Sequence, residues 1–154
     1  MKKFELHGDF TLSVEGNILI SLVRGPFNVE CTRAYLRELT PVAQTLAAAG
    51  SWAGITEYSV SALFPLDSSV IMRKNMEIAV KHLKLVANCW VVPPTVEGYG
   101  IVYNQARHVF DGILPFEVFE SSADARAWTR RQLAPHLSST ATGMARSDAV
   151  KHPE

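Results

Sequence analysis

The chain alternates between two kinds of apolar pattern. Short runs that alternate apolar with polar residues, or that are apolar throughout, predict strands, whereas apolar residues three or four positions apart predict helices. Gly, Pro and Asn residues separate these segments where turns and helix ends need them. In order, the pattern predicts strands at 10–14 and 18–23, a helix at 29–49, a strand at 52–58, a helix from near Val70, a strand at 86–92, a helix at 98–111, a strand at 116–119 and a helix at 122–133.

This order of elements, ββαβαβαβα, predicts an α/β fold. The first two strands flank the turn residues Glu15-Gly16-Asn17, so we expect them to form an antiparallel hairpin. Each later strand follows a helix, so these strands should run parallel and be joined by right-handed crossovers. The expected result is a mixed β-sheet with helices packed on it, in a single domain over residues 1–135. Residues 136–154 lose the periodicity, which predicts a disordered tail.

Three local signals refine the first helix. Asn28 stands directly before it and is a suitable N-cap. Pro41 lies inside it and removes one backbone hydrogen bond, so the helix should either kink there or restart with Thr40 as a cap. Gly50 follows the last apolar position and predicts a left-handed C-terminal cap.

Composition favours a cytoplasmic protein with one ordinary core. The chain has 154 residues, of which 47% are hydrophobic and 19% charged. Basic and acidic residues number 15 each, so no net charge draws the protein to nucleic acid or to an anionic membrane. No apolar run reaches the roughly 20 residues that span a bilayer, and the amino terminus does not resemble a secretory signal. The widely spaced Trp52, Trp90 and Trp128 are expected in the core.

Signals for catalysis, metals or cofactors are weak. Cys31 and Cys89 lack the spacing of a metal site or a disulfide framework, so we expect buried free thiols. The five histidines form no pair four residues apart, and no complete dinucleotide-binding glycine motif is present. Ser69, His108 and Asp111 supply the residue types of a hydrolase triad, but no Gly-x-Ser-x-Gly motif surrounds the serine. The sequence therefore favours a protein that is not an enzyme.

The most informative polar segment is Asp67-Ser68-Ser69, before the second predicted helix. A serine at a helix start can carry phosphate, because free backbone N–H groups and the helix dipole favour an anion there. The simpler interpretation is a helix cap. Arg73 and Lys74 belong to a basic side of the same helix, which either holds an acidic partner or is solvated. The candidate phosphoacceptor or binding surface is Asp67, Ser68, Ser69, Arg73 and Lys74.

Two segments resemble the SpoIIAA-like branch of the STAS domain family, the bacterial anti-sigma-factor antagonists, and the resemblance covers roughly residues 6–135. Asp67-Ser68-Ser69 is similar to the Asp-Ser-Ser-Gly start of the antagonists' phosphoacceptor helix, with Val70 in place of the glycine. The run 118–128 is similar to the closing strand and helix, in which Ala123, Ala127 and Trp128 would face the sheet. The resemblance implies a STAS mixed sheet, no catalysis or cofactor, and a phosphoacceptor at Ser69.

These observations support two hypotheses. The leading one is a non-enzymatic, cytoplasmic regulatory module that binds a protein partner through the surface around residues 67–74 and is modulated by phosphorylation of a serine there. The alternative is a small-molecule or lipid-binding protein of the same fold, with a pocket between helices lined by Phe64, Tyr99, Val102 and Phe110. Neither hypothesis requires a metal or a cofactor, and both leave a homodimer open.

Overall fold

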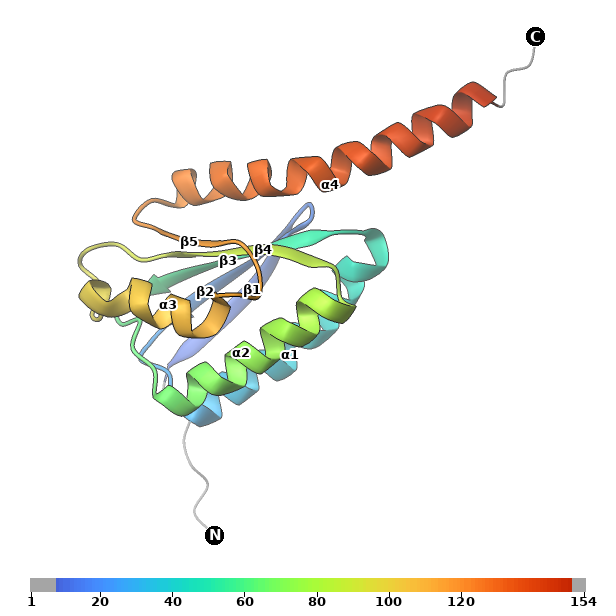
Figure 1. Cartoon of the computed structure of the whole chain (residues 1–154). Coiled ribbons are helices and arrows are strands. Elements are labelled where there is room, and N and C mark those ends of the chain that lie inside the picture. Colours follow the sequence, from blue (N-terminus) through green and yellow to red (C-terminus); the bar gives the residue numbers. More distant parts are fainter. Residues whose placement is uncertain (1–7, 151–154) are drawn as a thin grey trace.

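The computed structural model describes residues 8–150, and their side chains up to residue 137. Within these residues five strands, four α-helices and one short 3-10 helix follow the predicted order (Figure 1). The elements are β1 (Asp9–Glu15), β2 (Ile18–Arg24), α1 (Val29–Ala49), β3 (Trp52–Ser59), α2 (Leu66–His82), β4 (Leu85–Val91), η1 (Tyr99–Ile101), α3 (Val102–Phe110), β5 (Phe116–Phe119) and α4 (Ser122–Val150).

The strands form one mixed sheet in chain order, β1-β2-β3-β4-β5. β1 pairs antiparallel with β2, as the hairpin predicts, and the strands from β2 to β5 run parallel. Each right-handed crossover leads to the next strand in the same direction, so each crossover helix lies on the same face of the sheet. α1, α2 and α3 therefore cover one face, and α4 covers the other by packing on β3, β4 and β5 (Figure 1).

The central strands are buried on both faces, which explains why they are apolar almost throughout. In β2, Leu19 points into the larger core beneath α1, α2 and α3. Its neighbours Ile18 and Ile20 point into a second core beneath α4, together with Ile55 and Leu133. The tryptophans lie in or against these two cores, as predicted: Trp52, Trp90 and Trp128.

The first helix largely follows its predicted form. The Asn28 side-chain oxygen accepts a hydrogen bond from the Cys31 N–H at 2.9 Å, which confirms the N-cap. α1 continues through Pro41 as one helix, because a proline removes only one of its backbone hydrogen bonds. Gly50 is the C-terminal cap, as predicted, and has a positive φ of 144°, but its ψ of −160° lies outside the left-handed helical region that was expected. The Gly50 N–H nevertheless donates to the Leu46 carbonyl at 3.1 Å.

The last helix differs most from the sequence prediction. It begins at Ser122 as expected but runs past the predicted end at residue 133 to Val150, with Pro135 inside it. Helical backbone thus occupies positions 136–150, where the sequence predicted a disordered tail; residues 151–154 lie outside the described part. The buried side of α4 is formed by Ala125, Thr129 and Leu133, whereas the alanines predicted to face the sheet, Ala123 and Ala127, are exposed. These two alanines fall on the opposite side because the helix turns 100° per residue.

One arginine connects α4 to the strands beneath it. Arg126 donates two hydrogen bonds to the Glu15 carboxylate, at 3.0 and 3.1 Å, and also contacts Ser122. Its guanidinium lies 3.6 Å from the Glu57 carboxylate of β3. The hydrogen bonds from Arg126 lower the pKa of Glu15 below its ordinary value. The pairing is specific in geometry, but its exposure to solvent keeps its contribution to stability modest.

A matched pair of substitutions tests whether α4 belongs to the folded core. Leu133→Ala should lower the free energy of unfolding by about 2–4 kcal/mol, because Leu133 is 1% exposed and its removal leaves a cavity. Leu137→Ala, one turn later at 48% exposure, should change it by less than about 0.5 kcal/mol. Urea unfolding followed by circular dichroism measures both. Equal effects at the two positions would contradict the packing of α4 on the sheet.

Candidate functional site

The structure places the predicted triplet inside a helix instead of before it. α2 begins at Leu66, about four residues earlier than predicted, so Asp67, Ser68 and Ser69 form part of its first turn. The residue at the cap position is Pro65, and no side chain caps this end. The interpretation of the triplet as a helix cap is therefore wrong. Asp67 still suits its position, because a carboxylate in the first turn interacts favourably with the helix dipole.

Both serines of the triplet are buried. Ser68 is 0% exposed, and its Oγ accepts a hydrogen bond of 2.9 Å from the Thr32 hydroxyl of α1. Ser69 is 6% exposed. The two serines thus lie where α2 packs against the rest of the fold, and Ser68 joins it to α1. Ser68 is closed to a modifying enzyme in this structure, whereas Ser69 keeps a small exposed fraction, so phosphorylation of Ser69 stays a prediction.

Three of the five residues predicted as a binding surface lie around one cleft, whereas Asp67 and Ser68 are not part of its lining. Ser69, Arg73 and Lys74 border an open cleft of about 660 Å³ between α2 and α3, which we call the α2–α3 cleft. Arg73 crosses it and donates hydrogen bonds to the backbone carbonyls of Asp111, at 2.8 Å, and His108, at 3.4 Å. The full lining is Leu66, Ser69, Val70, Arg73, Lys74, Glu77, Arg107, His108 and Asp111.

The same cleft contains the three residue types of a hydrolase triad, but not their contacts. Ser69, His108 and Asp111 all border it. Among the described residues no hydrogen bond joins any two of these side chains, and the Asp111 carboxylate lies 4.0 Å from the Arg107 guanidinium instead. A triad needs the serine within hydrogen-bond reach of the histidine and the histidine oriented by the carboxylate. The arrangement gives no support to a hydrolase.

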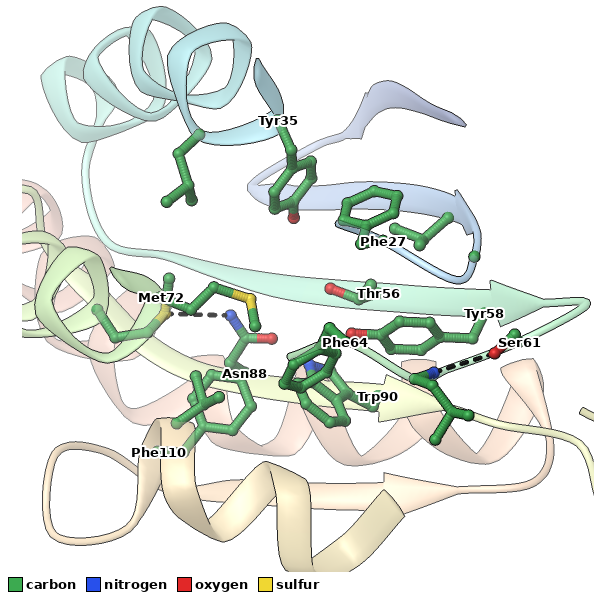
Figure 2. A pocket seen from close by; sticks show the side chains of 16 residues that line it. Phe27, Tyr35, Thr56, Tyr58, Ser61, Phe64, Met72, Asn88, Trp90 and Phe110 are labelled. Carbon is green, nitrogen blue, oxygen red and sulfur yellow. Dashed lines mark hydrogen bonds between the residues drawn. The ribbon is translucent and has the colours of Figure 1, made fainter. Parts of the chain in front are cut away.

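A second hollow lies deeper, between the sheet and the three helices of the larger core (Figure 2). It encloses about 40 Å³ of free space near the carboxyl ends of β2, β3 and β4. We call it the aromatic cavity, because six of its sixteen lining residues are aromatic and none carries a charge. The lining is Val23, Gly25, Phe27, Tyr35, Leu36, Thr56, Tyr58, Ser61, Leu63, Phe64, Met72, Met76, Asn88, Trp90, Val109 and Phe110.

Trp90 of β4 organises the aromatic wall. Its ring meets those of Tyr58, Phe64 and Phe110 edge to face, with centroids 5.2, 5.8 and 5.5 Å apart. Edge-to-face contacts of this kind add to the stability that burial alone supplies and favour one relative orientation. The rings come from β3, the segment before α2, β4 and α3, so the wall is assembled from residues far apart in the chain.

A few polar groups reach the cavity among these rings. Figure 2 shows the polar ends of Tyr35, Thr56, Tyr58 and Asn88 pointing toward a common space. The Tyr35 hydroxyl is paired with Ser21 Oγ at 2.8 Å. Burial raises the pKa of Tyr58 well above its ordinary value and also raises that of Tyr35, so both phenols stay neutral. The interior is therefore weakly polar and uncharged.

The segment between β3 and α2 closes one side of the cavity and is firmly attached. Val60 has a φ of 66°, a rare conformation for a β-branched residue. The Ser61 hydroxyl donates to the Glu97 carboxylate at 2.7 Å, and the Ala62 N–H donates to the Glu97 carbonyl at 2.8 Å. Gly25 permits the close approach of this segment, because a Cβ there would lie 2.1 Å from the Ser61 backbone oxygen.

The sequence identified only part of this cavity. Of the four residues proposed for a pocket, Phe64 and Phe110 line it, whereas Tyr99 lies on the surface and Val102 is buried elsewhere. The prediction missed every polar residue of the lining, among them Asn88. An available signal was its position in strand β4, where it is the one polar side chain in an otherwise apolar run. Strand residues of this kind point to a specific local role.

Other sequence predictions can be compared directly. Cys31 and Cys89 are free and buried, as expected, and burial raises the pKa of each thiol to about 11. Among the side chains of residues 8–137 no cluster of metal-ligating groups is found. No helix of the described chain combines the length and the apolar character needed to cross a membrane.

The structure defines an α/β protein with a five-stranded mixed sheet, covered on one face by three crossover helices and on the other by α4. No known family model matches the sequence, and no curated protein matches it either.

The burial of Ser69 can be tested with two substitutions in the same helical turn. Ser69→Glu should lower the free energy of unfolding by about 1–3 kcal/mol, because it forces a carboxylate into a buried position. Val70→Glu should change it by no more than about 0.5 kcal/mol, since Val70 is 63% exposed. Thermal unfolding measures the difference. Equal stability of the two variants would show that a negative group at residue 69 reaches the α2–α3 cleft, as a phosphoserine would have to.

Proposed function

We propose that this protein is a non-enzymatic binding module with a STAS-like arrangement, and that it holds a small, uncharged and mainly apolar molecule in the aromatic cavity. One observation carries the proposal: the cavity lies in the core, yet its walls leave free space and bear no charge. Protein interiors are packed with few voids, so we interpret a free space bordered by six aromatic rings as a ligand site.

The place of the cavity in the fold supports this function. The carboxyl ends of parallel strands are where open α/β sheets most often bind ligands. Thr56 of β3 and Trp90 of β4 are paired neighbours in the sheet at this end, and both line the cavity. Residues from three successive crossover helices complete it, so a ligand there would contact side chains from α1, α2 and α3.

The size of the cavity and the flexibility of its wall side chains define the kind of ligand. Without any movement of its walls, the free space of about 40 Å³ accommodates a group about the size of three water molecules. Met72 and Met76 form part of the wall, and methionine side chains adapt readily to different shapes because they have three rotatable bonds. A compact molecule, or the end of a longer one, therefore fits best. A charged group would be buried without a partner of opposite charge.

Binding without catalysis agrees with the chemistry of the walls. Neither cysteine borders the cavity, and the raised pKa values of Tyr35 and Tyr58 keep both phenols protonated, so neither is available as a general base near neutral pH. The separate, buried thiols also suit a reducing compartment, which supports the proposal that the protein acts in the cytoplasm.

A pair of probes of equal size tests binding in the cavity. Protein with 13C-labelled methionine methyl groups is titrated with acetone, which is neutral, and separately with acetate, which is charged. Acetone should shift the Met72 and Met76 signals in a saturable way, with a dissociation constant of about 1–10 mM for so small a ligand. Acetate should cause no saturable shift, because no basic side chain lines the cavity to balance its charge.

Two variants control this titration. Val109→Phe fills the cavity from α3 and should abolish the acetone-dependent shifts, at a loss of stability of about 1–3 kcal/mol. Leu133→Ala, which is also destabilised but alters α4 on the opposite face of the sheet, should bind acetone like the wild type. Acetone shifts that persist in Val109→Phe would refute binding at this position.

A second function, docking of a protein partner, is supported by the α2–α3 cleft. Leu66 and Val70 are 70% and 63% exposed at its edge, although both are apolar. Arg73 and Arg107 are paired with carboxylates, whereas Lys74 makes no ion pair among the described residues. An acidic segment that also carries apolar side chains complements such a surface.

Charge reversal distinguishes this docking from nonspecific attraction. In affinity capture from native lysate, Lys74→Glu should lose a partner that the wild type retains, because the substitution repels an acidic segment in the cleft. Lys81→Glu carries the same charge change on α2 but lies outside the cleft lining, so it should retain the partner. Loss of the partner from both variants would mean that only net charge matters, and retention by both would exclude the cleft.

A further inference from the structure

Asn88 presents an unpaired hydrogen-bond acceptor at the aromatic cavity. The residue is 8% exposed, and its Oδ1 is the one fully buried side-chain nitrogen or oxygen atom without a hydrogen-bond partner among the described side chains. Its Nδ2 reaches only the Met76 sulfur, a weak acceptor, at 3.8 Å. Buried polar atoms are nearly always paired, and leaving one unpaired is destabilising.

The fold makes room for this amide without using it. Gly54 lies beside Asn88 in the sheet register, and a Cβ on Gly54 would come within 3.0 Å of Asn88 Nδ2. The glycine thus leaves the space that the amide occupies. Because neither strand pairing nor a helix contact depends on Oδ1, this oxygen has no evident structural role. Figure 2 shows it pointing toward the space shared with the Tyr58 hydroxyl.

We infer that Asn88 selects the ligand, and that this ligand is an uncharged alcohol or phenol whose hydroxyl group donates a hydrogen bond to Asn88 Oδ1. This inference rests on the proposed binding function of the cavity. The ligand oxygen accepts in turn from the Tyr58 hydroxyl, while its hydrocarbon part contacts Trp90 and Phe110. An ammonium group would also donate to Oδ1, but the lining contains no carboxylate to balance its charge.

Two probes of almost identical shape separate selection by Asn88 from simple filling of the cavity. 2-Propanol has a hydroxyl group that donates, whereas acetone has a carbonyl oxygen that only accepts. Both are titrated into protein with labelled methionine methyl groups and a 15N-labelled Asn88 side-chain amide. 2-Propanol should bind about tenfold more tightly than acetone, because it satisfies the buried acceptor. It alone should shift the Asn88 amide signals strongly.

Substitution of Asn88 provides the matched control. Asn88→Leu removes the acceptor and preserves much of the volume, so it should abolish the preference for 2-propanol while acetone affinity changes by less than about threefold. The variant should fold at least as stably as the wild type, since no polar atom is left unpaired. Asn88→Ala is the second variant, in case leucine does not fit beside Gly54, and it should also lose the preference.

The outcomes separate the inference from the function on which it rests. Equal affinities for the two probes in the wild type would overturn the role of Asn88 and leave the cavity as a binding site. Tighter binding of acetone would overturn it too, because it would mean that the amide NH2 group faces the ligand. A preference for 2-propanol that persists in both Asn88 variants would also overturn the role of Asn88. If neither probe binds in a saturable way, the proposed binding function itself is refuted.

Discussion

The handedness of the crossovers determines most of this structure. From β2 to β5 the chain adds each parallel strand on the same side of the previous one, and a right-handed connection then puts every crossover helix on the same face. That face receives α1, α2 and α3 and the larger core. The opposite face would be left apolar and open, so the chain needs one further helix after the last strand. α4 fills this role, and Arg126 connects it to Glu15 and Glu57.

The same constraint positions the aromatic cavity. Parallel strands bring their carboxyl ends to one edge, and side chains from the three crossover helices on one face line the cavity there. The rings around Trp90 fill most of the space between them, and the attached segment that follows β3 closes it. A polar amide at Asn88 is tolerated in this apolar setting because Gly54 provides space beside it. Fold and cavity therefore have a common origin in the order of the strands.

The sequence predicted what depends on local pattern. Periodicity identified every strand and helix in the right order, and Asn28 was recognisable as a cap because capping involves only residues within one turn. Periodicity could not reveal that Ser68 is buried, since this depends on its contact with Thr32, 36 residues earlier in the chain. The start of α2 was misplaced because the triplet fits equally well before a helix and in its first turn. The cavity lining combines residues from six elements and their connecting segments, whose register no local pattern determines.

The late position of α4 in the chain also has a consequence for biosynthesis. While a ribosome makes the protein, β2, β3 and β4 emerge well before the helix that will shield Ile18, Ile20 and Ile55. Domains are synthesised at about 5–20 residues per second, so this apolar surface stays uncovered for seconds in the nascent chain. A sheet exposed in this way can pair with other incomplete chains. The growing polypeptide is thus vulnerable to aggregation until α4 leaves the exit tunnel and covers this surface.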